Sequence, residues 1–117
     1  MKPAAVKNKK VTVLGAARSG LAAAQLLHKK GARVFVSERK SLNTASAPLQ
    51  KLKEAKIEYE TGEHSERLLD ADFIIVSPGI GEQTPVMKRI REKGLPVYSE
   101  LEAASWFCKA SIVAVTG

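Results

Sequence analysis

The segment GAARSG, residues 15–20, is the first place where residue types and spacing could support chemistry. It joins a strand-like apolar run to a helical pattern, so its backbone N–H groups and the positive end of the helix dipole would point at one spot. That arrangement favours a phosphate by about 0.3–1 kcal/mol. The segment therefore predicts a phosphate-binding turn. Its residues are Gly15, Ala16, Ala17, Arg18, Ser19 and Gly20, of which Arg18 could add a cation and Ser19 a hydroxyl donor.

The same turn allows two other interpretations. It matches the dinucleotide fingerprint G-x-G-x-x-G except at Ala17, which stands where the middle glycine lets a pyrophosphate approach the backbone. A Rossmann domain that binds NAD(H) is one alternative, although the methyl group of Ala17 counts against it. The other is a tight turn without a ligand, in a domain that only docks onto a partner, because glycines here also serve helix packing.

A second group of polar residues, Glu38, Arg39 and Lys40, follows the next strand-like run. In dinucleotide enzymes an acid near this place accepts hydrogen bonds from a ribose. In another nucleotide site it could accept from the N–H of a pyrimidine base. Arg39 and Lys40 could oppose a phosphate or could be solvated, so this loop is a second candidate for ligand contact.

The remaining chemistry-bearing residues are less informative. Pro78 and Gly79 follow another strand and could bring bare backbone near a ligand, but a simple turn explains the pair equally well. His28 and His64 lack a partner at catalytic or metal spacing, so we expect structural or surface roles. Cys108 is the only cysteine, which excludes a disulfide framework and a cysteine cluster for a metal. No catalytic residue and no metal ligand can be named.

Strand-like and helix-like runs alternate along the chain. β-branched runs alternating with helical periods predict an α/β fold, a Rossmann-like open parallel sheet with helices on both faces, in a single domain. In such a sheet, ligands lie beyond the carboxyl ends of the strands, which is where both candidate loops fall. The expected strands are 11–15, 33–37, 57–60, 73–77, 96–99 and 112–116. The expected helices are 19–30, 47–55, 66–69, 85–92 and 100–108.

Local signals support these helix boundaries. Thr84 is expected to cap the helix that Pro85 opens, and Gly94 is expected to close it. Ser99 and Glu102 have the capping-box spacing, in which each side chain satisfies a free backbone N–H of the other residue.

With 117 residues, 44% hydrophobic and 26% charged, the chain has the composition of one globular domain, which excludes a disordered or fibrous protein. The net charge of +7 suits an anionic partner. Much of that charge lies in residues 1–10 and 87–93, where a solvated tail and an exposed helix face explain it. No signal peptide or transmembrane run is evident. We expect a soluble, cytoplasmic protein without a nucleic-acid or membrane partner.

Four stretches together resemble the amino-terminal part of the Mur ligase family, and within it the branch that adds D-glutamate. SPGI (77–80) followed by SELE (99–102) and then by a strand ending VTG is the specific part of the resemblance. The branch that adds L-alanine usually has a first loop of the form G-x-G-G-x-G, which GAARSG does not match. The four stretches are VTVLGAARSGLAAAQLLHKKGARVFVSERK, DADFIIVSPGI, GLPVYSELE and SIVAVTG.

The resemblance implies ATP-dependent amide formation in a full-length enzyme. The carboxylate of UDP-N-acetylmuramoyl-L-alanine is phosphorylated with ATP and Mg²⁺, and D-glutamate attacks the acyl phosphate. Residues 1–110 would form the UDP-sugar-binding domain, and 111–117 would begin the ATP-binding domain, with Gly117 as the first glycine of its phosphate loop. Since the lysine of that loop is missing, we expect this chain to be a substrate-binding domain without ligase activity.

The resemblance also implies roles for particular residues. Residues 15–20 resemble the diphosphate cradle of the family, although Ala17 stands where some members have glycine. Glu38 sits where a shorter acid commonly reaches the uracil, and Arg39 and Lys40 line the same pocket. The loop beside the muramoyl sugar is matched by Ser77, Pro78 and Gly79.

Overall fold

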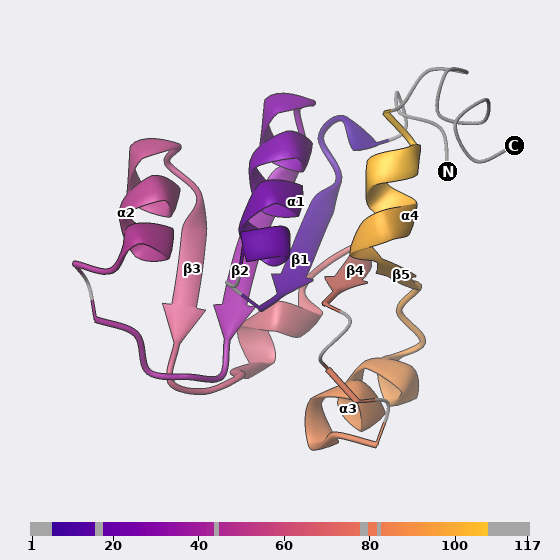
Figure 1. Cartoon of the computed structure of the whole chain (residues 1–117). Helices are drawn as coiled ribbons and strands as arrows, with labels where there is room; N and C mark the ends of the chain where they lie inside the picture. The colour runs from indigo at the N-terminus through magenta and orange to yellow at the C-terminus, as the bar shows by residue number, and fades with distance from the viewer. Residues whose placement is uncertain (1–5, 16–17, 44, 78–79, 82, 108–117) are drawn as a thin grey trace, which may run out of the picture.

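The computed structural model describes residues 6–15, 18–43, 45–77, 80–81 and 83–107. Its strands form one parallel sheet in the order β3-β2-β1-β4-β5 (Figure 1), as the alternating pattern predicted. The strands are β1 (Lys10–Leu14), β2 (Arg33–Glu38), β3 (Glu58–Thr61), β4 (Phe73–Val76) and β5 (Val97–Ser99). The α-helices are α1 (Arg18–Lys29), α2 (Ala47–Glu54), α3 (Pro85–Lys93) and α4 (Glu100–Ser105), and η2 (Glu66–Leu69) is a 3₁₀ helix.

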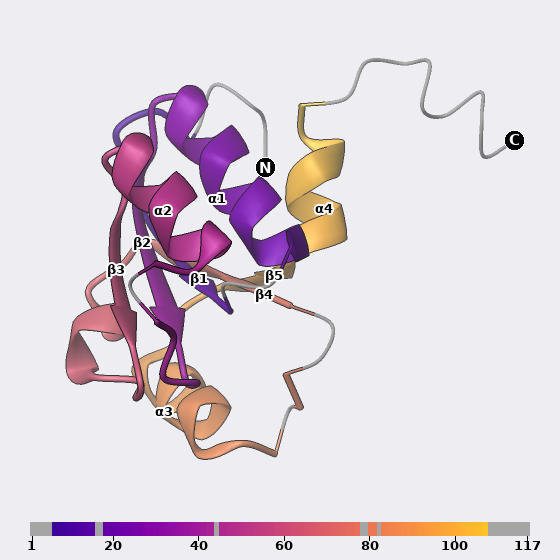
Figure 2. The same cartoon turned by 60° about the vertical axis from the view of Figure 1, so that its left-hand side comes forward.

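Helices cover both faces of the sheet (Figure 2). α1, α2 and α4 pack on one face, and α3 lies against the other, together with η2. Successive side chains of a strand point to opposite faces, so Val11 and Val13 of β1 enter the first core and Leu14 enters the second. Because both faces are buried, the central strands are nearly continuous apolar runs.

The strand register brings the carboxyl ends of three strands together. Leu14, the last residue of β1, lies opposite Ser37 of β2 and Val76 of β4. The chain builds outward from β1 on one side and then crosses to β4 on the other, so the strand order reverses beside β1. Ligands bind at this switch point in open α/β sheets.

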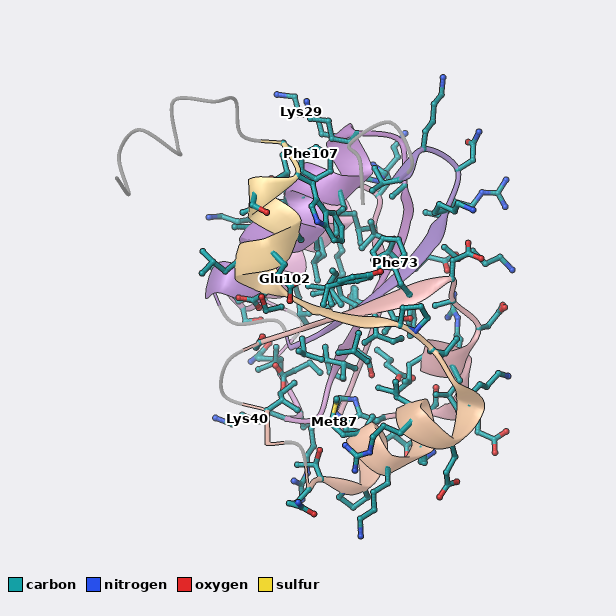
Figure 3. The ribbon with its side chains drawn as sticks, turned by 90° about the vertical axis from the view of Figure 1, so that its right-hand side faces the viewer. Lys29, Lys40, Phe73, Met87, Glu102 and Phe107 are labelled. Atoms are coloured by element: carbon teal, nitrogen blue, oxygen red, sulfur yellow. The ribbon has the colours of Figure 1, made fainter. Side chains whose placement is uncertain are left out.

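Most predicted boundaries agree with the structure within one or two residues. The helix expected over 100–108 ends at Ser105, and Trp106 then packs edge-on against Phe73 and Tyr98 with ring centroids 5.7 and 5.1 Å away. Phe73 lies beneath α4 (Figure 3). The strand expected over 112–116 and Cys108 lie outside the described residues. Among the described residues, no helix has the length and apolar character needed to span a bilayer.

The predicted caps are correct except for the Thr84 side chain. Gly94 ends α3 with φ +73°, and the capping box between Ser99 and Glu102 is complete. Thr84 occupies the N-cap position before Pro85, but its hydroxyl makes no capping bond. It instead donates to the carbonyl of Gly81 at 2.8 Å, which also accepts from the backbone N–H of Thr84 at 3.2 Å in the turn that precedes α3.

Candidate functional site

The glycine turn after β1 is built so closely that two of its positions have no room for a side chain. Gly15 has φ +103°, and a Cβ there would lie 2.7 Å from Ser77 Oγ. A Cβ on Gly20, in the first turn of α1, would overlap the carbonyl oxygen of Gly15. The turn therefore presents bare backbone and the amino end of α1 at the carboxyl edge of the sheet, the geometry that binds anions.

The structure describes some of the predicted site residues only in part and others not at all. Ala16, Ala17, Pro78, Gly79 and Gly117 lie outside the described residues. The structure gives Arg18 and Ser19 as the first two residues of α1 and describes their backbone alone. Their predicted contacts with a ligand stay predictions.

The end of β4 is tied to the glycine turn through a buried glutamate. Ser77 Oγ lies 3.0 Å from the carbonyl oxygen of Leu14 and 2.6 Å from Oε1 of Glu100. Glu100 is the first residue of α4 and only 8% exposed, and its Oε1 is 3.3 Å from the Cβ that Gly20 would carry. Sequence reasoning missed Glu100. The available signal was an acid in the first turn of a helix, inside the motif SELE.

The end of β2 holds the three residues predicted to contact a base. Glu38 closes β2, and its Oε2 accepts from the backbone N–H of Lys40 at 2.9 Å. The carbonyl of Lys40 accepts from the N–H of Gly62 at 3.1 Å, so the segment is attached to the end of β3. Arg39 and Lys40 are exposed, and the Lys40 side chain points away from the body of the molecule (Figure 3).

A partly buried polar cluster, formed by Ser37, Glu60, His64 and Ser65, adjoins that segment. Ser37 is completely buried, and its Oγ lies 2.5 Å from Glu60 Oε2 and 2.7 Å from His64 Nδ1. Ser65 donates to Glu60 from its backbone N–H at 2.9 Å and from its hydroxyl. His64 thus has a structural contact with β2, which fits the expected structural or surface role, although the sequence spacing gave no sign of this partner.

Burial and hydrogen bonding shift both titratable groups of the cluster. Burial alone would raise the pKa of Glu60, but hydrogen bonds from Ser37 and Ser65 outweigh it and hold that pKa below its ordinary value of 4.5. Burial lowers the pKa of His64 below 6.5, against the pull of Glu60 and Glu38. At neutral pH the cluster therefore contains an ionised Glu60 and a neutral His64.

The contact between Ser37 and His64 is not a nucleophile with its base. The Ser37 side chain has no access to solvent, and its neighbour Glu60 is an acceptor for its single hydroxyl hydrogen. Within residues 6–15, 18–43, 45–77, 80–81 and 83–107, no group of three histidine, cysteine or acidic side chains is placed to hold a metal ion. The geometry fits ligand binding by backbone donors and a carboxylate.

A hollow of about 460 Å³ lies away from this edge, beside the amino-terminal halves of β1, β2 and β3, and two of its cations already have partners. Lys10 pairs with Asp70 at 3.3 Å, and Arg67 pairs with Glu58. Because ligands of this architecture bind beyond the carboxyl ends of the strands, we place the candidate site at the glycine turn.

Comparison with known families decides which Rossmann-like group this is. The MurD N-terminal domain family matches residues 10–86, more than half of the 117 residues, and this range includes the glycine turn, Glu38 and Ser77. The chain belongs to the MurD N-terminal domain family. The resemblance drawn from the four sequence stretches is confirmed.

Curated relatives of this MurD N-terminal domain chain carry the name UDP-N-acetylmuramoylalanine--D-glutamate ligase. The Chlorobium limicola protein is 49% identical over 112 residues, which are 96% of this chain and 24% of that protein. The Salinibacter ruber protein is 48% identical over 117 residues, which are 100% of this chain and 25% of that protein. The chain thus spans about a quarter of the length of these relatives.

A solved structure supports the fold of this MurD N-terminal domain. Shikimate dehydrogenase from Aquifex aeolicus superposes with a TM-score of 0.52 at 24% identity, over 86% of this chain and 46% of that one. At this identity the likeness concerns the Rossmann-like fold alone.

Proposed function

We propose that this chain binds UDP-N-acetylmuramoyl-L-alanine as the substrate domain of a ligase that adds D-glutamate to it. The observation that carries the proposal is the order of the strand ends at the switch point, which is β2, β1, β4. The ligand has the same order of parts, because its diphosphate lies between the uridine and the sugar. Membership of the MurD N-terminal domain family and the names of the relatives support the same assignment.

Each part of the ligand has a strand end of suitable chemistry. The diphosphate meets the turn 15–20, whose bare backbone and helix terminus favour an anion. Glu38 accepts from the N–H of the uracil, beside Arg39 and Lys40. The sugar lies against Ser77, Pro78 and Gly79. Neighbouring strands are about 4.8 Å apart, so the three adjacent strand ends span about 10 Å, and the diphosphate would lie at their centre with the uridine and the sugar extending to either side.

The backbone of the site joins these strand ends directly. The N–H of Gly15 donates to the carbonyl of Ser37 at 2.8 Å, so the diphosphate turn and the base-contact segment move as one unit. Ser77 joins the other side of the turn through the carbonyl of Leu14. A ligand that lies across the three ends would meet Gly15, Ser37 and Ser77 already joined by hydrogen bonds, which lowers the cost of binding.

In this proposal the remaining chemistry belongs to the full-length ligase. ATP and Mg²⁺ supply the phosphoryl chemistry there, D-glutamate supplies the amine, and Gly117 begins the ATP phosphate loop. The reaction would take place in the cytoplasm as a step of peptidoglycan precursor synthesis. We expect the isolated chain to release no phosphate above background with ATP, D-glutamate and the UDP-sugar. Release that depends on all three would contradict this expectation.

Titration calorimetry with UDP-N-acetylmuramoyl-L-alanine, UDP and NADH tests the binding proposal. Two or three charge-assisted hydrogen bonds of about 1.5–3 kcal/mol each, less the cost of association, support a Kd of roughly millimolar to micromolar. Saturation by NADH alone would overturn the proposal in favour of a dinucleotide-binding domain. No binding of either uridine compound at millimolar concentration would also overturn it.

A pair of charge-matched variants locates the base. Glu38→Gln replaces the carboxylate predicted to accept from the uracil, and should weaken UDP binding by about tenfold, because a hydrogen bond to a charged group contributes about 1.5 kcal/mol or more. Glu54→Gln removes the same charge from the exposed end of α2 and serves as the control. Equal affinities of the two variants would remove Glu38 from the site.

A further inference from the structure

The polar cluster of Ser37, Glu60, His64 and Ser65 has one hydrogen-bond arrangement at neutral pH. Glu60 is ionised and can only accept, so the single hydroxyl hydrogen of Ser37 points at Glu60 Oε2, 2.5 Å away. Ser37 Oγ then has lone pairs left for the neighbour at 2.7 Å, which is His64 Nδ1. The neutral imidazole therefore carries its proton on Nδ1 and donates it to Ser37.

This arrangement fixes the segment that we assign to the base. Ser37 immediately precedes Glu38, and the register of β2 with β3 places Glu38 opposite Thr61. The backbone N–H of Lys40 holds one oxygen of Glu38, and Gly62 holds the carbonyl of Lys40. The segment 37–40 and the segment 60–65 are thus joined at both ends, and His64 closes the connection from behind.

α3 supports His64 from the other side. The guanidinium Nη1 of Arg89 donates to the backbone carbonyl of His64 at 3.1 Å. His64 is therefore held by its backbone from α3 and by its ring from β2. A side chain held at two points in this way has a defined orientation relative to Glu38, which lies close enough to interact with it electrostatically.

We propose that His64 is a positioning residue for base recognition, which in its neutral form donates to Ser37 and so holds in place the segment that carries Glu38. The proposal rests on the function proposed above and adds a residue that no sequence motif singles out. It also predicts a pH dependence. A protonated His64 would attract the Glu38 carboxylate and would compete with the ligand for it.

The charges around His64 set the direction of this effect. Glu60 from β3 and Glu38 from β2 favour the imidazolium, whereas Arg39 after β2 and Arg89 from α3 oppose it. Burial opposes it most, so the ring is neutral at neutral pH and takes up a proton only below its ordinary pKa. Ligand affinity should accordingly be highest at neutral pH and should fall on acidification.

Calorimetry with UDP-N-acetylmuramoyl-L-alanine between about pH 5.5 and about pH 8 tests the proposal in the window where histidine titrates. A diphosphate diester has no ionisation there, unlike a terminal phosphate with its second pKa of about 6. We expect wild-type affinity to fall about fivefold or more at the acidic end, the lower part of the range for coupled sites.

Two variants of His64 separate the hydrogen bond from the titration. His64→Asn keeps an N–H donor toward Ser37 without a titrating ring, so it should bind with wild-type affinity at about pH 8 and show no pH dependence. His64→Leu removes the donor and should bind more weakly throughout. His28→Asn, at an exposed histidine at the end of α1, is the matched control and should behave as wild type.

A measurement on the wild-type chain covers the case in which His64→Leu does not fold. Because coupling is reciprocal, a ligand that prefers neutral His64 must lower the pKa of that ring further, by about one unit for each tenfold change in affinity. NMR titration of the two imidazoles with and without the UDP-sugar measures this, with His28 as the internal reference. A His64 pKa that ligand leaves unchanged, or a wild-type pH profile in His64→Asn, overturns the role of His64 while binding itself stands. Failure of the wild-type chain to bind at any pH overturns the proposed function and this inference together.

Discussion

Two serines at strand ends hold the carboxyl edge of the sheet with the same kind of bond. Ser37 after the core of β2 bonds to Glu60 of β3 at 2.5 Å, and Ser77 after β4 bonds to Glu100 after β5 at 2.6 Å. Glu60 lies on the next strand outward, at the register position opposite Ser37, and Glu100 begins α4 directly after Ser99, which lies opposite Val76. The fold thus has a serine–glutamate hydrogen bond on each side of β1.

The two pairs differ in their third partner. Ser37 lies two residues after Phe35 and therefore points to the same face of the sheet, the one covered by η2 and α3. His64 approaches Ser37 on this face. Ser77 lies two residues after Ile75, whose side chain packs on the other face of the sheet from Phe35. The third partner of Ser77 is the backbone carbonyl of Leu14. A backbone carbonyl has no titration in the physiological range, whereas an imidazole does. The comparison teaches that the fixed side, which we propose for the diphosphate and the sugar, has no titrating third partner, while the base side, which we propose for the uracil, has one and can respond to pH.

The largest expected effect comes from Gly20→Ala, which breaks the fixed side. The new Cβ overlaps the carbonyl of Gly15, and a backbone atom cannot move aside as a flexible side chain can. We expect a loss of about 3 kcal/mol, the upper part of the range for overpacking, with loss of UDP-sugar binding. Urea unfolding and calorimetry measure the two effects.

Gly81→Ala is the control for that substitution. No atom lies within 4 Å of a Cβ at Gly81, so its cost should stay within about 0.5 kcal/mol. If Gly20→Ala were as well tolerated as Gly81→Ala, the close contact between the turn and α1 would not limit the site.

Truncation of the two serines compares the two pairs directly. Ser77→Ala leaves the buried Glu100 without its donor, at a cost of about 2–3 kcal/mol. Ser37→Ala should cost less, about 1–2 kcal/mol, because Glu60 keeps two donors from Ser65. Free energies of unfolding from urea titrations test the order, and a larger loss in Ser37→Ala would show that His64 contributes more stability than Glu100.

The sequence was sufficient to predict the fold, and the location of the site stays a prediction. β-branched runs alternate with helical periods throughout, and glycine spacing marks the turn whose first residue, Gly15, is bonded to the end of β2. Helix ends were equally predictable at Gly94 and Ser99, because the signals there act over a few residues. Local chemistry of this kind does not depend on the tertiary structure.

The contacts of the two glutamates could not be predicted in the same way. Glu60 meets Ser37 and Glu100 meets Ser77 only because parallel strands pair in one register, and each partner is 23 residues away along the chain. His64 reaches Ser37 through a loop whose path no spacing rule describes. The Thr84 hydroxyl donates to the carbonyl of Gly81 and makes no capping bond, and the sequence signal for the cap did not indicate this alternative partner.

The cap of α4 offers a smaller perturbation of the fixed side. Ser99 accepts from the N–H of Glu102 at 3.1 Å, one residue from Glu100, so Ser99→Ala loosens the helix end that holds Glu100 in place. We expect a loss of about 1 kcal/mol of stability. Thr84→Ala at the start of α3 is the control and should cost about 0.5 kcal/mol or less, since that hydroxyl makes no cap. Equal losses in thermal unfolding would contradict the difference between the two caps.

The smallest expected effect is the pH dependence of stability, which the base side alone should show. The neutral form of His64 is favoured in the fold, so its contribution is complete above its ordinary pKa of 6.5 and is lost as pH falls through the lowered pKa. The ionised form of Glu60 is favoured in the same way, so its contribution is complete above 4.5 and is lost below. Stability should therefore decline in two stages on acidification.

His64→Asn isolates the first stage, since it leaves Glu60 with its donors from Ser37 and Ser65. The variant should lose less stability than wild type between about pH 6.5 and about pH 5, by no more than about 1 kcal/mol, because solvent screens a half-buried ring. His28→Asn should follow the wild-type curve. The measurement is the free energy of unfolding at each pH. Identical curves for wild type and His64→Asn would mean that the two sides of β1 respond to acid alike. The difference between the third partners of Ser37 and Ser77 would then have no effect on stability.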